Sequence, residues 1–247
     1  AHDAEVIVND GTASVTLTEY CLSELPEELI PIVAEFLGLA LDSLGNFPVD
    51  VCLYTDPDIF TGIPSMVGEA GKIYSLTINY NSKTYTAQTK IPELIYLDSV
   101  YVKNQPDPDT DSLYRLYGMI SDPDTLGNYY RYLTSQNGEP FYTGFASVTD
   151  DLFFNGQTFE FTVDRGIAPT EDYNVDTYGY FFTGDTAILK WCVIDQATYT
   201  FFTSLEFDSG TDGPFSSATI VQTNISNGGL GIWCGYGVTY DTVYVGE

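Results

Sequence analysis

Short alternating segments separated by turn-forming residues constrain the fold of this chain more than any other feature. From Gly71 to Pro92 the sequence reads GKIYSLTINYNSKTYTAQTKIP, in which apolar residues recur on both sides of a polar turn at Asn79–Ser82. This pattern predicts a β-hairpin. Turns of the type Asn-Gly or Asn-Asp-Gly separate similar segments elsewhere, and Tyr and Phe, which favour half-buried strands, number 20 and 15. The sequence therefore predicts a mainly β protein.

The strand pattern divides into two expected domains. Residues 1–96 fit an immunoglobulin-like β-sandwich, and residues 97–247 fit a larger antiparallel β-sandwich or barrel-like domain. We place the junction between Pro92 and Ser99. One helix is expected within the second domain from Asp195 to Phe207, because Asp195 is a suitable N-cap and the apolar residues that follow share one helical face.

A second helix is expected as an insertion in the first domain, at about residues 25–44. Apolar residues there recur at helical spacing, and Pro31 is tolerated best in a first turn, so we expect the helix from Pro31 to Leu44. Two interpretations stay open for its apolar face. It covers an open end of the β-domain, or it docks a partner through side chains that include Phe36, Leu37 and Leu41.

The stretch from Gly213 to Gly237 combines closely spaced glycines with Leu230, Ile232, Trp233 and Tyr236. Glycine in an extended segment marks a bulge or a close approach of another backbone. We therefore expect the last structural strand of the second domain here. Asn224-Ile225-Ser226 also matches the N-x-[ST] glycosylation pattern, which often arises by chance.

Charge narrows the classes of partner. Lys and Arg number 8 against 35 Asp and Glu, for a net charge of −27, which repels phosphate backbones and anionic lipid headgroups. Nucleic acid is therefore excluded as an expected partner. The same charge attracts cations or a basic protein surface, although an acidic surface often serves solubility alone.

Two acidic loops are candidate calcium sites, because calcium prefers carboxylate and carbonyl oxygens. The candidate ligands are Asp107, Asp109, Asp111, Asp122 and Asp124. Their spacing lacks the complete EF-hand pattern. Turn chemistry around proline explains the same aspartates without a metal, so both interpretations stay open. No other cofactor is expected.

Catalytic motifs are not evident. The single histidine, His2, lies at the front of the chain, which disfavours Ser-His-Asp and Cys-His catalysis. The glycines after Asn227 lead into another strand-like segment, whereas a phosphate loop leads into a helix. Paired carboxylates arise by chance among 35 acidic residues. We expect a non-enzymatic protein with no catalytic residues.

Four widely spaced cysteines, without the spacing of a zinc motif, leave two alternatives. In the first alternative, each domain contains one disulfide, and the pairs are Cys21 with Cys52 and Cys192 with Cys234. In the second, all four are buried free thiols.

Four blocks in order resemble a family of unknown function from Bacteroidetes, whose members are outer-membrane lipoproteins encoded beside TonB-dependent, SusC-like transporters. The blocks are Gly71–Val100, DPDTLGNYYRY (Asp122–Tyr132), TDDLFFNGQTFEF (Thr149–Phe161) and TNISNGGLGIWCGYG (Thr223–Gly237). The resemblance implies an immunoglobulin-like domain, a larger β-domain, export and a lipid on a cysteine upstream. That cysteine is absent here, and the chain lacks an initial Met, so we expect a mature or trimmed chain.

The resemblance thus implies a lipid-anchored protein of the outer membrane, on the cell surface or the periplasmic face. We expect it to be an accessory or ligand-capturing subunit of a TonB-dependent complex, with a SusC-like protein or another outer-membrane subunit as its partner. Since no segment of this chain reaches the roughly 18 apolar residues of a spanning helix, membrane contact is expected only through the lipid. The alternative is a secreted carbohydrate-binding or calcium-dependent adhesive module.

Overall fold

The computed structural model describes residues 2–30, 33, 51–105, 112–168, 171–172, 174–209 and 220–246. The chain divides into two compact units. Unit 1 comprises Ala1–Lys90 with Thr223–Trp233, and unit 2 comprises Ile91–Gln222 with Cys234–Glu247. We predicted a domain boundary between residues 96 and 97. In the structure, unit 1 ends at Lys90 and also includes Thr223–Trp233.

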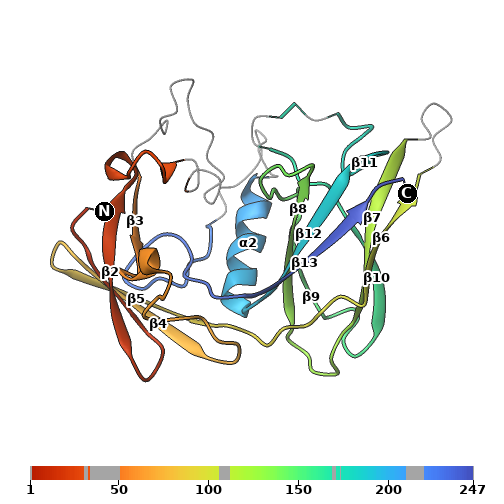
Figure 1. Cartoon of the computed structure of the whole chain (residues 1–247). Helices are drawn as coiled ribbons and strands as arrows, with labels where there is room; N and C mark the ends of the chain where they lie inside the picture. The colour runs from red at the N-terminus through yellow and green to blue at the C-terminus, as the bar shows by residue number, and fades with distance from the viewer. Residues whose placement is uncertain are drawn as a thin grey trace. The chain divides into compact units, whose positions relative to one another are not determined.

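Unit 1 holds one antiparallel five-stranded sheet in the order β3-β2-β1-β4-β5 (Figure 1). Its strands are β1 (Glu5–Asn9), β2 (Ser14–Cys21), β3 (Cys52–Thr55), β4 (Ile73–Tyr80) and β5 (Lys83–Lys90), with short 3-10 helices η1 (Leu22–Glu24) and η2 (Ile59–Thr61). The hairpin predicted from Gly71 to Pro92 is β4 and β5. Its turn residues Asn81 and Ser82 have φ of 49° and 62°, which suits a two-residue turn between strands.

Alternation along these strands produces a buried face. Val8 of β1 lies opposite Leu76 of β4, and Leu76 lies opposite Ala87 of β5. All three are buried, as are Val6 and Tyr74 on the same face of their strands. Because side chains alternate across a strand, this register places the polar intervening residues on the other face.

The free edge of β5 is covered by part of the glycine-rich stretch. The Ser226 hydroxyl accepts a hydrogen bond from the Thr86 N–H (2.7 Å), and the Ser226 N–H donates to the Thr86 carbonyl (2.8 Å). The side-chain amides of Asn224 and Asn227 donate to the carbonyls of Gln88 (3.1 Å) and Thr84 (2.6 Å). These side chains satisfy an exposed strand edge that would otherwise pair with another chain.

The strand expected over Gly213–Gly237 is therefore wrong for its described residues. Residues 220–236 form no strand, and β13 begins only at Gly237. Asn224 and Ser226 bond to β5 through their side chains, which interrupts a regular ladder. The same bonds occupy the Asn224 amide, the group that glycosylation would modify.

Unit 2 contains two four-stranded antiparallel sheets and helix α2 (Gln196–Ser209) (Figure 1). In the first sheet, β7 (Leu113–Ser121) pairs with β6 (Ser99–Asn104), with β10 (Thr158–Val163) and with β11 (Phe181–Phe182). The second has the order β13-β12-β8-β9, with β13 (Gly237–Tyr244), β12 (Thr186–Ile194), β8 (Tyr129–Gln136) and β9 (Val148–Asp150).

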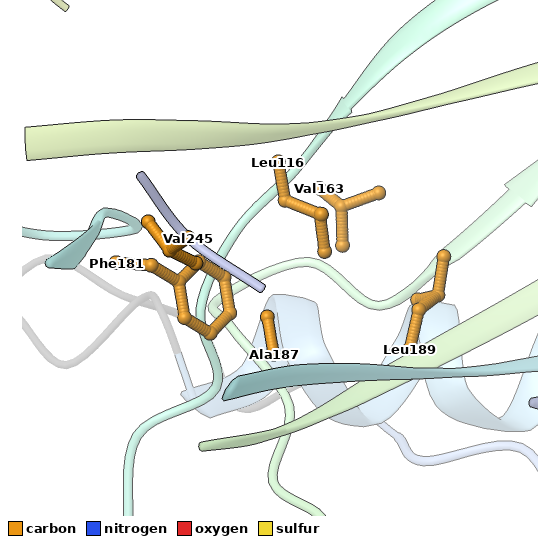
Figure 2. Close-up of a cluster of buried hydrophobic side chains, with 6 residues drawn as sticks. All are labelled: Leu116, Val163, Phe181, Ala187, Leu189 and Val245. Carbon is orange, nitrogen blue, oxygen red and sulfur yellow. The ribbon is translucent and has the colours of Figure 1, made fainter. Parts of the chain in front are cut away.

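Side chains from both sheets meet in the core of unit 2, as in a β-sandwich. Figure 2 shows Leu116 and Val163 of the first sheet facing Ala187 and Leu189 of the second, with Phe181 and Val245 completing the cluster. These six residues are at most 2% exposed. The prediction of a mainly β, antiparallel fold is confirmed.

Helix α2 confirms the helix predicted from Asp195 to Phe207. The Asp195 carboxylate accepts hydrogen bonds from the Thr198 N–H (2.9 Å) and hydroxyl (2.6 Å), which is the expected N-cap geometry. The other predicted helix, Pro31–Leu44, lies outside the described residues except for Val33, so that prediction and its partner residues Phe36, Leu37 and Leu41 stay predictions. Within the described part of the chain, the structure contains no helix with the length and apolar character to cross a membrane.

Candidate functional site: an apolar tip on two braced loops

Two loops of unit 2 are bonded to each other at their backbones. Residues 122–128 connect β7 to β8, and residues 151–157 connect β9 to β10. Their sequences are DPDTLGN and DLFFNGQ. Each begins with a buried aspartate, Asp122 at 6% and Asp151 at 1% exposure. A buried carboxylate is costly unless it is well bonded, so the partners of these two aspartates determine the conformation of the loops.

Asp151 binds the facing loop through its carboxylate. Its oxygens accept hydrogen bonds from the Gly127 N–H at 2.9 and 3.1 Å and from the Asn128 N–H at 3.0 Å. The Asn128 carbonyl in turn accepts from the Asp151 N–H at 3.2 Å. Gly127 has φ of +106°, a conformation that glycine adopts readily and that turns its N–H toward the carboxylate.

Asp122 makes the equivalent connection in the opposite direction. Its carboxylate accepts a hydrogen bond from the Tyr130 hydroxyl and another from the Gly156 N–H (3.3 Å) in the second loop. The Tyr130 ring is fully buried and stacks against Trp191, with ring centroids 4.9 Å apart. Burial, with the Asp122 carboxylate as a second cause, raises the pKa of Tyr130, so its hydroxyl stays a donor. The loop bases are thus fixed to the core.

The braced loops present apolar side chains to solvent. Leu126 is 63% exposed, Leu152 is 64% exposed and Phe153 is 90% exposed. Phe159, at the start of β10, is 41% exposed, and its ring stacks on Phe154 with centroids 5.1 Å apart. We call Leu126, Leu152, Phe153 and Phe159 the apolar tip. Each is attached to, or stacked against, a loop segment whose backbone is hydrogen-bonded in place.

The sequence around the tip carries acidic but no basic side chains. Residues 116–130 and 132–164 contain no Lys or Arg, whereas Asp124 is exposed in the first loop and Asp150 precedes the second. The tip therefore offers apolar contact area beside negative charge. Chemically, this arrangement suits binding to an apolar depression with a positively charged rim.

Only part of the predicted calcium site lies within the described residues. Asp122 and Asp124 are on the first loop, but the Asp122 oxygens face Tyr130 and Gly156. Asp107, Asp109 and Asp111 lie outside the described residues, so the calcium hypothesis stays a prediction. Among the described residues, the one set of three or more His, Cys, Asp and Glu side chains close enough to share a metal ion is in unit 1.

The sequence reasoning missed the apolar tip. The available signal was the pair Leu152-Phe153, which directly follows two aspartates and is separated from the Asn155-Gly156 turn only by Phe154. Apolar residues next to a turn are usually read as the end of a buried strand. Here Phe154 is buried and Phe153 is exposed, so adjacent phenylalanines have opposite environments.

The cysteines divide between the two alternatives. Cys21 and Cys52 form a disulfide between opposed residues of β2 and β3. Cys192 and Cys234 are free, and both line a cavity of about 60 Å³ in unit 2 beside Arg131 and Phe202. Burial raises the pKa of the Cys192 thiol to about 11, so this thiol is protonated at neutral pH. Of the two alternatives, the disulfide applies to Cys21 and Cys52, and the free thiols apply to Cys192 and Cys234.

Comparison with known proteins places the chain in a family whose activity is undefined. No curated protein and no solved structure matches the sequence. The family model described as a domain of unknown function, DUF4249, matches residues 2–242, which is nearly the whole chain. The protein therefore belongs to the DUF4249 family.

Proposed function

We propose that this protein is a non-enzymatic, lipid-anchored accessory subunit of a TonB-dependent outer-membrane complex, and that the apolar tip of unit 2 is the surface that contacts its protein partner. The exposure of Phe153 on a braced loop is the observation that supports docking. The proposed membrane location and SusC-like partner rest on the family resemblance of the sequence blocks described above. Two of those blocks are the loops that form the tip.

Rigid presentation supports a binding role for the tip. An exposed Phe on a mobile loop can turn back onto the protein surface, whereas the Asp151 bonds to Gly127 and Asn128 hold this loop in one conformation. A preorganised aromatic side chain loses little conformational entropy on binding. Aromatic residues at the centre of an interface often contribute 2 kcal/mol or more, which corresponds to about thirtyfold in affinity.

Charge favours a protein partner over a lipid surface. The net charge of −27 and the exposed Asp124 oppose approach to anionic headgroups. A transporter loop or periplasmic face with an apolar depression bordered by Lys or Arg satisfies both features of the tip. The partner we commit to is therefore an outer-membrane protein with that chemistry.

Detergent-solubilised native outer membranes provide the test. A variant with a photo-crosslinking aromatic residue in place of Phe153 is expected to capture a TonB-dependent outer-membrane protein, identified by mass spectrometry. The same residue at Val175, which is 78% exposed in the same unit, is the matched control and is expected not to capture it.

Substitution gives the quantitative arm of the experiment. Leu152→Ser with Phe153→Ser is expected to reduce co-purification of that protein by at least about tenfold. Val175→Ser leaves co-purification unchanged, and thermal unfolding of all three proteins stays the same because the changed side chains are exposed. Recovery of wild type only as a free monomer contradicts the proposal. If the double variant co-purifies with that protein as well as wild type does, or if the tip binds protein-free lipid vesicles, then the tip is not a protein-docking surface.

A further inference from the structure

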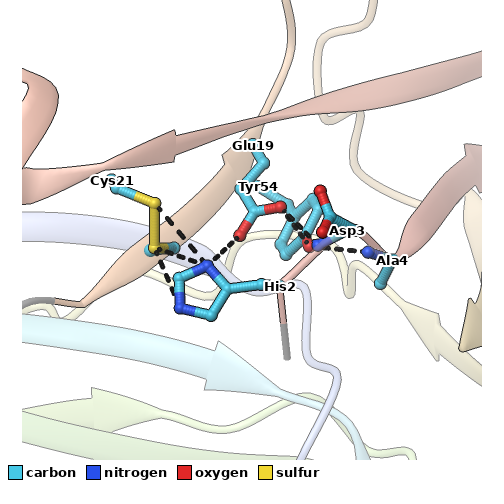
Figure 3. Close-up of a disulfide and its surroundings, with 7 residues drawn as sticks. His2, Asp3, Ala4, Glu19, Cys21 and Tyr54 are labelled. Atoms are coloured by element: carbon cyan, nitrogen blue, oxygen red, sulfur yellow. Dashed lines mark hydrogen bonds and ion pairs between the residues drawn. A yellow bond between two sulfur atoms is a disulfide. The ribbon is translucent and has the colours of Figure 1, made fainter.

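A compact cluster in unit 1 brings together four side chains that are common metal ligands. His2 precedes β1, Glu19 and Cys21 lie on the same face of β2, and Cys52 is opposite Cys21 on β3. One ligand atom from each residue lies within 4.8 Å of all the others. Figure 3 shows the His2 ring between the disulfide and the Glu19 carboxylate. The proposed docking function does not use this cluster, since the apolar tip belongs to unit 2.

The distances match those between ligands of a tetrahedral zinc ion. Ligands at about 2.0–2.3 Å from zinc lie about 3.3–3.8 Å from one another in a tetrahedron. The Nδ1 atom of His2 is 3.4 Å from the Cys52 sulfur, 3.9 Å from the Cys21 sulfur and 3.1 Å from Glu19 Oε1. The two sulfurs, bonded at 2.06 Å, are the pair that must separate.

Glu19 is held in position for a ligand. Its Oε2 accepts hydrogen bonds from the Tyr54 hydroxyl and the Asp3 N–H, both at 2.8 Å. Its Oε1 is buried and lies 3.1 Å from His2 Nδ1, with no other hydrogen-bond partner among the described residues. A buried carboxylate oxygen whose polar neighbour is an imidazole nitrogen is a position where one cation could bind both atoms.

We propose that reduction of the Cys21–Cys52 disulfide opens a Zn²⁺ site formed by His2 Nδ1, the Glu19 carboxylate and the two cysteine thiolates. While the disulfide is closed, neither sulfur carries the negative charge that zinc coordination uses. Two thiolates with one imidazole and one carboxylate suit zinc, whereas calcium and magnesium prefer oxygen ligands alone. The disulfide therefore acts as the gate of the site.

The chemical steps balance with a dithiol protein reductant. Such a reductant transfers two electrons and two protons, so that Cys21 and Cys52 become thiols and the reductant becomes a disulfide. Zinc then displaces both thiol protons, which pass to water, and binds the two thiolates. The Nδ1 lone pair of His2 and the Glu19 carboxylate complete the coordination.

The test compares oxidised and reduced full-length chain with zinc alone as the probe. After reduction with a phosphine and its anaerobic removal, calorimetric titration with ZnCl₂ is expected to show one site per chain, at least about a hundredfold tighter than in the oxidised chain. Co²⁺ in place of Zn²⁺ is expected to give thiolate charge-transfer absorption. His2→Ala and Glu19→Gln each weaken zinc binding by at least about tenfold.

Two controls separate this site from other thiols and from loss of folding. Cys192→Ser with Cys234→Ser is expected to keep the site, whereas Cys21→Ser with Cys52→Ser removes it. Zinc is also expected to slow alkylation of Cys21 and Cys52 in the reduced chain, as measured peptide by peptide. Equal zinc affinity in both redox states, binding that survives Cys21→Ser with Cys52→Ser, or alkylation unaffected by zinc overturns the proposal. If reduction unfolds the sheet, zinc is expected not to slow the alkylation of Cys21 and Cys52, and this result also overturns the proposal.

Discussion

Of the two buried carboxylates at the base of the apolar tip, Asp151 accepts more hydrogen bonds from the facing loop than Asp122 does. Replacing Asp151 by Ala leaves the N–H groups of Gly127 and Asn128 without their acceptor at the base of the tip. Hydrogen bonds to a charged group contribute about 1.5–3 kcal/mol, so we expect Asp151→Ala to lower the free energy of unfolding by about 3 kcal/mol. Denaturant unfolding measures the loss, and amide exchange at Gly127 and Asn128 locates it.

The matched control for this prediction is Asp124→Ala, in the same loop. Asp124 is exposed, and exposed substitutions typically change stability by less than about 0.5 kcal/mol. If Asp124→Ala and Asp151→Ala destabilise the protein equally, the Asp151 network does not hold the loops in place.

Asp10 gives a prediction about pH at the turn of the first hairpin. Its carboxylate accepts hydrogen bonds from the Ala13 and Thr12 N–H groups and from the Thr12 hydroxyl, and these lower its pKa from 3.8 to about 2. Because the folded-state pKa is depressed, the contribution to stability is complete above pH 4 and is lost as pH falls toward about 2. The difference in stability between wild type and Asp10→Asn should therefore shrink across that window.

A carboxyl-carbon NMR titration of Asp10 checks the same statement directly. The expected midpoint is near 2, and substitution of Thr12 by Ala, which removes one donor, moves it upward. A midpoint near 3.8 in the folded protein would mean that the turn does not hold the carboxylate as described.

At the level of elements, the edge of β5 depends on a distant segment. We expect the triple variant with Asn224→Ala, Ser226→Ala and Asn227→Ala to expose backbone groups of Thr84, Thr86 and Gln88. An uncovered strand edge pairs with the edge of another chain, so the variant should self-associate as its concentration rises. Sedimentation equilibrium measures this, and each lost hydrogen bond lowers stability by about 1 kcal/mol.

Gln222→Ala is the control for the edge prediction. Gln222 is exposed, and its side-chain amide donates a hydrogen bond to the nearby Ile220 carbonyl. This variant should stay monomeric with wild-type stability. If the triple variant also stays monomeric with wild-type stability, then Asn224, Ser226 and Asn227 do not protect the edge of β5.

The elements that could be predicted from the sequence are those specified by neighbouring residues. The hairpin of β4 and β5 and helix α2 each combine a local periodicity with a local turn or cap, such as Asp195. The position of the segment 224–227 along the edge of β5 could not be predicted, because Asn227 bonds to Thr84 across 143 residues. The apolar tip depends similarly on Asp151 and Gly127, which are 24 residues apart, and its exposed Phe153 reverses the usual association of apolar residues with burial.

For the whole molecule, the dominant physical property is unbalanced charge. With 35 acidic and 8 basic residues, folding brings carboxylates closer together than they are in the unfolded chain. Raising the salt concentration from about 0.01 to 0.15 M shortens the Debye length from about 30 to 8 Å. We therefore expect NaCl to raise the melting temperature, by about 2–4 °C for each kcal/mol of repulsion that is screened.

A comparison of CaCl₂ with MgCl₂ distinguishes calcium binding at a specific site from this general screening of charge. If Asp107, Asp109 and Asp111 bind calcium together with Asp122 and Asp124, then CaCl₂ stabilises the protein more than MgCl₂ at the same ionic strength. A ligand at a hundred times its dissociation constant adds about 2.7 kcal/mol. Asp107→Asn with Asp109→Asn should abolish that excess and leave the response to NaCl nearly intact, because a net charge of −27 changes by only two charges. Equal melting temperatures in CaCl₂ and MgCl₂ would assign these aspartates to turn formation, since screening does not distinguish two divalent cations.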